Sequence, residues 1–123
     1  MSKRILIVDD IGFIVEFESK VIDALSKEVS QKILIDSANS VREALSKIAQ
    51  NDYDAMVVDM NLPDGSGIEI AKAAQEKNAQ TRIAALTIYP QKFEPDHTFF
   101  DVFFKKPILP ATYKENIRRL LQV

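Results

Sequence analysis

Short apolar runs alternate along this chain with longer stretches in which apolar residues recur every three or four positions. The runs at 5–8 and 55–58 are continuous, and together with the apolar parts of later stretches they predict strands at residues 5–8, 32–37, 55–58, 81–87 and 102–105. Continuous runs of this length are typical of strands that are buried on both faces of a parallel sheet. The stretches between them have the spacing of amphipathic helices. The pattern therefore predicts strands and helices in strict alternation.

Four of the connecting stretches carry signals for a helix. Residues 11–25 have one apolar face, on which Glu18 is the polar exception. Capping-box patterns, a serine followed three residues later by glutamate, begin at Ser40 and Ser66 and predict helix starts there. The second of these helices extends to about Lys77. Pro110 or Thr112 begins a last helix, which has Tyr113, Ile117, Leu120 and Leu121 on its inner face.

This alternation predicts an α/β protein, a doubly wound three-layer sandwich of (βα)5 type with a parallel five-stranded sheet of order 2-1-3-4-5. No linker interrupts residues 1–123, so we expect a single domain. The stretch 88–101 contains Pro90 and Pro95 and no glycine. Proline disfavours a helix interior, so the fourth helix is predicted to be shortened or irregular, with residues 88–101 the most mobile part.

Composition narrows the classes of function. Of the 123 residues, 46% are hydrophobic and 28% are charged, and the net charge is -2, which argues against direct nucleic-acid or membrane binding. The absence of cysteine and the single His97 exclude disulfides and thiolate or multi-histidine metal sites. No apolar run is long enough to cross a membrane, so we expect a cytoplasmic protein.

Polar residues stand where the predicted strands end. Asp9 and Asp10 follow the first strand, Asp59 the third, Thr87 the fourth, and Lys106 the fifth. The carboxyl ends of parallel strands share one edge of the sheet, and strands one and three are neighbours at the switch point. Individually each residue has an ordinary explanation as a helix cap, a turn former or solvated charge. Together they predict a site.

Three clustered carboxylates repel one another unless a cation offsets them, and Mg²⁺ prefers such oxygen ligands. Lys106 adds a positive charge and Thr87 a hydroxyl donor, which suits a phosphoryl group. Asp59 is then the candidate nucleophile, giving an acyl phosphate.

The chain resembles the response-regulator receiver domains of two-component signalling, which are chemotaxis-regulator-like proteins of flavodoxin-like fold. The resemblance rests on Ile-Leu-Ile-Val-Asp-Asp at residues 5–10, Asp-Met-Asn-Leu-Pro-Asp-Gly at residues 59–65, Thr87, and Lys106-Pro107. It implies that Asp59 is the phosphoacceptor. It also implies that Asp9 and Asp10 are the acidic pair at the Mg²⁺ ion, which Asp59 and the backbone carbonyl of Asn61 also contact.

The same resemblance assigns roles to the later residues. Thr87 and Lys106 correspond to the switch hydroxyl and the phosphate-binding lysine, and Phe103 to the aromatic switch residue. Pro107 is the candidate for a preceding cis peptide bond. The expected partners are a histidine kinase or phosphotransfer protein and an unknown downstream protein. Such a domain is not an enzyme in the usual sense, although it assists its own aspartyl phosphorylation and dephosphorylation.

The chain also departs from that family. Ile88 stands where receivers usually have a small residue, and it is expected to crowd the phosphoryl pocket. Phe93, Phe99, Phe100 and Phe104 are either local core or a partner surface. An atypical, phosphate-independent receiver that acts as a protein-binding module is therefore the alternative.

Two further classes fit less well. In a carrier of flavin mononucleotide, Asp9 and Asp10 would repel the phosphate. A phosphatase with an Asp-x-Asp nucleophile is disfavoured by Asn61.

Overall fold

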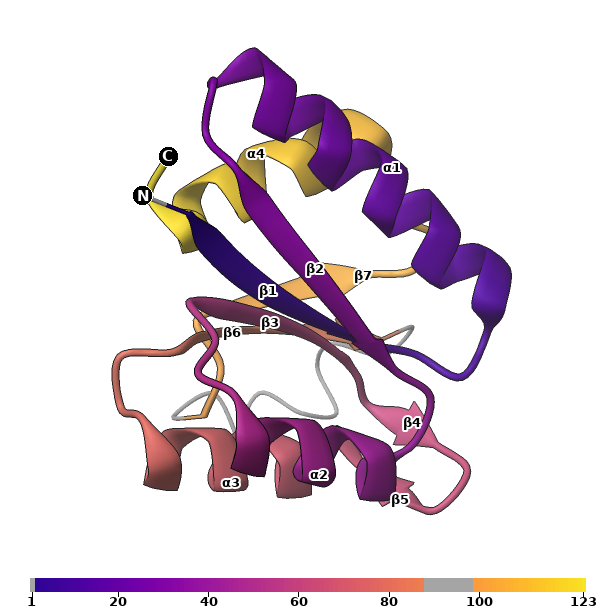
Figure 1. Cartoon of the computed structure of the whole chain (residues 1–123). Coiled ribbons are helices and arrows are strands. Elements are labelled where there is room, and N and C mark those ends of the chain that lie inside the picture. Colours follow the sequence, from indigo (N-terminus) through magenta and orange to yellow (C-terminus); the bar gives the residue numbers. More distant parts are fainter. Residues whose placement is uncertain (1, 88–98) are drawn as a thin grey trace.

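A parallel sheet forms the centre of the protein, seen in a computed structural model that describes residues 2–87 and 99–123. Its strands are β1 (Lys3–Val8), β2 (Ile33–Ala38), β3 (Ala55–Asp59), β6 (Arg82–Thr87) and β7 (Val102–Lys105). They are hydrogen-bonded in the order β2-β1-β3-β6-β7, and every neighbouring pair is parallel (Figure 1). Counted along the sheet's own strands, this is the predicted order 2-1-3-4-5, which is confirmed.

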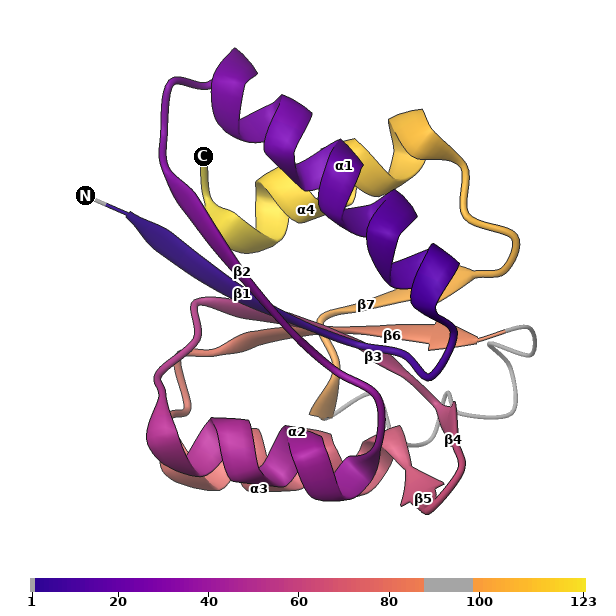
Figure 2. The ribbon, with the colours of Figure 1, turned by 45° about the vertical axis from the view of Figure 1, so that its right-hand side comes forward.

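Helices cover both faces of this sheet. Helices α1 (Gly12–Glu28) and α4 (Pro110–Leu121) lie side by side on one face, and α2 (Val41–Gln50) and α3 (Gly67–Lys77) on the other (Figures 1 and 2). Successive residues of β1 alternate between the two cores: Ile5 and Ile7 pack towards α1 and α4, while Leu6 and Val8 pack towards α2 and α3. The predicted three-layer architecture is therefore confirmed.

The serine caps define two helix starts, as predicted, although with different partners. Ser40 Oγ accepts a hydrogen bond of 3.1 Å from the Glu43 N–H at the start of α2. Ser66 Oγ instead accepts from the Ile68 N–H, at 3.2 Å, and not from that of Glu69. Each bond satisfies a donor that the first helical turn leaves unpaired.

A small hairpin between β3 and α3 was predicted only as a turn. Strands β4 (Asn61–Leu62) and β5 (Gly65–Ser66) pair antiparallel, with Pro63 and Asp64 at the tip. The hairpin follows directly after Asp59, so its position determines where the backbone of Asn61 lies.

The predicted fourth helix falls largely outside the described residues. So do Ile88, Pro90, Pro95 and His97 with their expected roles. Nearby aromatic residues fill the core, since Phe100 and Phe104 are buried on opposite faces of the sheet. Among the helices that the structure describes, none has the length and apolar character needed to span a membrane.

Candidate functional site

Three carboxylates meet at the C-terminal edge of the sheet. Asp9 and Asp10 follow β1, and Asp59 is the last residue of β3, the strand beside it. One oxygen from each lies within 4.8 Å of the others. Asp9 and Asp59 are almost fully buried, each 2% exposed, whereas Asp10 faces solvent. The sheet topology thus brings together residues that are some fifty positions apart in the chain.

Asp9 has an unsatisfied side chain. Its Oδ1 accepts a hydrogen bond of 2.9 Å from the Ile11 N–H, but Oδ2 has no partner in the described part of the chain. Burial raises the pKa of this carboxyl, the hydrogen bond from Ile11 partly offsets the rise, and the charges of Asp59 and Asp10 add to it. A buried carboxylate oxygen with no donor is costly, so a cation or water is expected to face it.

Asp59 is held between two donors. The Asn61 N–H donates to its Oδ1 at 3.1 Å, and Lys106 Nζ lies 3.4 Å from its Oδ2. Behind it, the backbone is closely packed against Gly67, where a β-carbon would lie 2.8 Å from the Asp59 carbonyl oxygen. The carboxylate therefore has a defined position, with its second oxygen next to a positive charge.

Thr87 and Lys106 lie on the far side of Asp59. Thr87 ends β6 and is fully buried, and its carbonyl accepts from the Lys106 N–H at 3.0 Å. The lysine follows β7, and its side chain is only a quarter exposed. The edge of the sheet thus places the hydroxyl, the ammonium group and the carboxylates in one neighbourhood.

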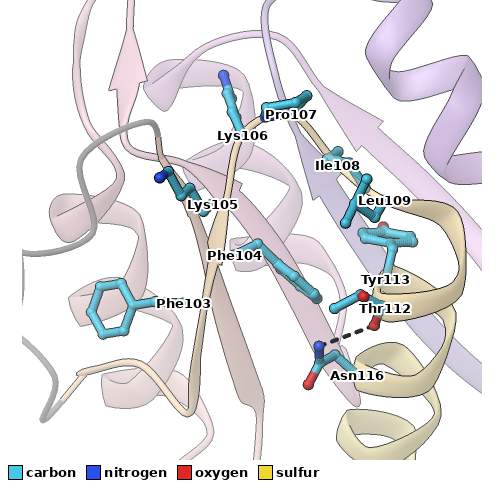
Figure 3. A pocket seen from close by; sticks show the side chains of 10 residues that line it. All are labelled: Phe103, Phe104, Lys105, Lys106, Pro107, Ile108, Leu109, Thr112, Tyr113 and Asn116. Carbon is cyan, nitrogen blue, oxygen red and sulfur yellow. Dashed lines mark hydrogen bonds between the residues drawn. The ribbon is translucent and has the colours of Figure 1, made fainter.

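Phe103 and Phe104 project from opposite sides of β7 (Figure 3). The Phe103 ring is half-buried on the α2 and α3 side and lies 5.5 Å from the Phe100 ring, centroid to centroid. Phe104 packs on Tyr113 and lines a cavity of about 390 Å³ between β7 and α4, bordered by the cis peptide bond between Lys106 and Pro107.

The donor set fits a hard divalent cation. Carboxylate oxygens are the ligands that Mg²⁺ prefers, and a dication would both offset the repulsion among the three acids and face the unpartnered Asp9 Oδ2.

The family model of the response regulator receiver domain matches residues 5–113. The chain belongs to that family. Receiver domains are signalling domains of two-component systems, where signalling is based on phosphorylation, and not classical enzymes. They typically bind Mg²⁺ at an acidic pocket like the one formed here.

Solved receivers share the whole fold. The chemotaxis response regulator CheY4 of Vibrio cholerae is 25% identical with a TM-score of 0.85, and the match covers 98% of this chain and 100% of that one. The response regulator TrrA of Thermotoga maritima, solved in complex with Mg(2+)-BeF, is 30% identical with a TM-score of 0.83, and the match covers 97% and 99%.

Curated relatives are longer proteins. The transcriptional regulatory protein CiaR of Streptococcus pneumoniae is 26% identical over 99% of this chain, which spans 52% of its length. The response regulator protein PilR of Pseudomonas aeruginosa is 40% identical over 43% of this chain and 12% of its own length. This receiver thus corresponds to about half or less of these relatives.

Sequence reasoning missed the contacts of two acidic residues. Asp64, predicted as a turn former, accepts hydrogen bonds from α2. Glu18, noted only as a polar exception, is fully buried and accepts a hydrogen bond from Tyr113. Neither partner is near in sequence, so local patterns carried no signal for these contacts.

Proposed function

We propose that this receiver is a phosphorylation switch in which Asp59 accepts a phosphoryl group from the phosphohistidine of a histidine kinase or phosphotransfer protein. The observation that carries the proposal is the position of Asp59, whose Oδ2 faces Lys106 while two further carboxylates lie beside it. A strand-end carboxylate in this setting is poised for attack on phosphorus once a cation neutralises the cluster.

The transfer exchanges one bond for another. A lone pair of an Asp59 carboxylate oxygen forms the new P–O bond, the P–N bond to the donor histidine breaks, and the imidazole nitrogen keeps the electron pair. The product is an aspartyl phosphate. Positioning and charge neutralisation are the main contributions a protein makes to such a step.

Asp9, Asp10 and Asp59, with the Asn61 carbonyl, are the proposed Mg²⁺ ligands. When bound, the ion supplies positive charge for the phosphoryl oxygens. The ammonium group of Lys106 binds a further phosphoryl oxygen. Its position 3.4 Å from Asp59 Oδ2 supports this role. The solved complex of TrrA with Mg(2+)-BeF supports a metal-dependent site in a related receiver.

Thr87 and Phe103 are proposed to transmit phosphorylation of Asp59 to the surface that a downstream protein binds. The Thr87 hydroxyl would bond to the phosphoryl group, and the half-buried Phe103 would repack, which changes the face presented to a downstream protein. The backbone hydrogen bond between Thr87 and Lys106 ties β6 to β7 and supports joint movement of the two residues.

Relatives support the choice of donor and the extent of the domain. The matches include the hybrid signal transduction histidine kinase L of Dictyostelium discoideum and the sensor protein EvgS of Escherichia coli. We take residues 1–123 as one receiver domain, since one five-stranded sheet joins strands from β1 to β7.

The test is phosphorylation by acetyl phosphate with Mg²⁺, followed by intact-protein mass spectrometry. We expect one phosphoryl group on the wild type and none on Asp59→Asn or in the presence of a chelator. Asp52→Asn, which removes an exposed carboxylate near the opposite end of β3, is the matched control and should be phosphorylated normally. An unmodified wild type would instead favour a phosphate-independent binding module.

A further inference from the structure

Asp64, at the tip of the β4–β5 hairpin, joins that hairpin to the start of α2. Its Oδ1 accepts from the Val41 N–H at 2.8 Å, and its Oδ2 accepts from the Arg42 N–H at 3.0 Å. Both donors are N–H groups in the first turn of α2, and such groups have no acceptor within their own helix. One carboxylate thus satisfies two backbone groups that are more than twenty residues away in sequence.

The hairpin also packs directly on the same helix end. A β-carbon at Gly65 would lie 3.2 Å from Val41 Cγ2, so the Gly65 backbone packs closely against the Val41 side chain at this point. Leu62, on the other arm of the hairpin, packs into the core under α2 and α3. The hairpin is therefore attached to α2 by polar contacts at its tip and by apolar contacts along its strands.

These contacts complete a chain of bonds around the acidic cluster. On one side, the Asp9 N–H donates to the Ala38 carbonyl at 3.0 Å, where β2 leads into α2. On the other side, Asn61 pairs with Ser66 in the hairpin and donates its N–H to Asp59. The start of α2 thus lies between the two loops. The Asp9–Ala38 bond joins it to the loop of Asp9, and the bonds to Asp64 join it to the hairpin that follows Asp59.

Electrostatics favour the ionised form of Asp64 in this position. The hydrogen bonds from Arg42 and Val41 lower the pKa of its carboxyl, and the positive end of the α2 dipole lies beside it. The carboxylate is therefore charged at neutral pH and bound through charge-assisted hydrogen bonds.

We propose that Asp64 is a positioning residue of the phosphorylation site: by holding the hairpin on α2, it sets the place of the Asn61 backbone relative to Asp59. This inference rests on the proposed function for its effect on phosphorylation, but its effect on Mg²⁺ binding can be measured separately. Loss of a group that orients metal ligands typically lowers metal affinity by about ten- to a hundredfold.

The test compares Asp64→Ala with Ser40→Ala. Both remove side-chain caps from the start of α2, but among the described residues the hydrogen bond of Ser40 Oγ is to its own helix, from the Glu43 N–H, and not to the hairpin. Mg²⁺ is titrated into each protein and followed by the amide NMR signal of Asn61, and phosphorylation by acetyl phosphate is timed. Urea unfolding of each variant checks that all are folded under these conditions.

We expect Asp64→Ala to bind Mg²⁺ about tenfold more weakly and to be phosphorylated more slowly, with Ser40→Ala close to wild type. Asp64→Asn, which keeps one acceptor oxygen, should recover part of the loss, and it serves in place of Asp64→Ala if that variant unfolds. Equal Mg²⁺ affinity in the Asp64 and Ser40 variants would overturn the inference, leaving Asp64 as a helix cap. A wild type that binds Mg²⁺ but accepts no phosphoryl group would overturn the proposed function alone.

Discussion

The two helical layers differ in where they place their polar contacts. In the α1 and α4 layer, a carboxyl is buried between the helices: Tyr113 donates its hydroxyl to Glu18 Oε1 at 2.7 Å, and both side chains are 0% exposed. In the α2 and α3 layer, Asp64 and Lys77 instead bond to backbone groups at the two ends of α2, where such groups need partners. The first arrangement costs free energy when the carboxyl ionises, whereas the second supplies bonds that the helices lack.

Glu18 illustrates the cost. Burial raises the pKa of its carboxyl to about 8, although the hydrogen bond from Tyr113 opposes the rise and the charges of Asp9 and Asp59 add to it. Its Oε2 has no hydrogen-bond partner in the ranges 2–87 and 99–123. Burial and the adjacent Glu18 also raise the pKa of the Tyr113 hydroxyl, so the phenol stays a donor.

Lys77 illustrates the opposite arrangement. Its Nζ donates to the Ile48 carbonyl at 2.5 Å and to the Asn51 carbonyl at 2.7 Å, at the end of α2. With Asp64 at the other end, α2 has partners from outside the helix at both termini. The comparison teaches that a polar side chain stabilises this fold where it bonds to an unpaired backbone group. Where an ionisable side chain is buried in the core, it makes the stability of the fold depend on pH.

The largest expected effect tests the buried carboxyl. Because the pKa of Glu18 is higher in the folded protein than in the unfolded chain, the folded state holds an extra proton between about pH 4.5 and about pH 8. The contribution of Glu18 to the free energy of unfolding should therefore fall as pH rises through that window, by an amount on the order of 5 kcal/mol. Glu18→Gln should remove this decline, measured by urea unfolding from pH 5 to pH 9.

Glu16→Gln is the control, since Glu16 lies on the exposed face of the same helix. Its pH profile should match that of the wild type. Parallel profiles for Glu18→Gln and the wild type would show that Glu18 is not the source of the pH dependence.

The next effect tests close packing at the start of α3. A β-carbon at Gly67 would lie 2.8 Å from both the Asp59 carbonyl oxygen and Val58 Cγ1. Gly67→Ala should therefore lower the free energy of unfolding by about 2 kcal/mol, despite the better helix propensity of alanine. Gly12 lies at the start of α1, where no atom of the described residues beyond its chain neighbours and its own helix backbone comes within 4 Å of a new β-carbon, so Gly12→Ala should lose nothing. Equal stability of the two variants in thermal unfolding would contradict the packing argument.

A smaller effect tests the cap at the end of α2. Lys77→Met keeps much of the aliphatic stem but leaves the Ile48 and Asn51 carbonyls without this donor, so we expect a loss of about 1 kcal/mol in chemical unfolding. Lys20→Met removes an exposed lysine whose ion-pair partner among the described residues is Glu16, one turn away, and it should change stability much less. Similar losses in both variants would argue against a capping role.

The smallest effect concerns the surface of the first layer. Lys114 Nζ lies 3.0 Å from Glu28 Oε2 and joins α4 to the end of α1, but both side chains are about a third exposed or more. Lys114→Ala should cost roughly 0.5 kcal/mol or less, and the loss should shrink at high salt because exposed pairs are screened. A loss that thermal unfolding shows to be independent of salt would mean that packing of the lysine stem is the cause.

Much of the fold was predictable because buried positions are apolar and recur along the chain with the period of a strand or a helix. The continuous apolar run at 55–58 predicted a central strand, which the structure places between β1 and β6. Alternating strands and helices allow few chain topologies, and the predicted order of the sheet was confirmed. The clustering of Asp9 and Asp59 followed from that order, because neighbouring parallel strands end at the same edge.

What the sequence alone determined is therefore the strands of the central sheet, the four described helices, the sheet order and the edge at which the candidate site residues gather. Each of these depends on local periodicity or on a topological rule. The tertiary structure alone decided that Asp64 bonds to α2, that Glu18 is buried against Tyr113, and that Ser66 caps at Ile68 rather than at Glu69. These contacts depend on donor–acceptor distances of 2.7 to 3.2 Å and on side-chain directions. Residues far apart in the chain reach such distances only after the helices have packed against the sheet.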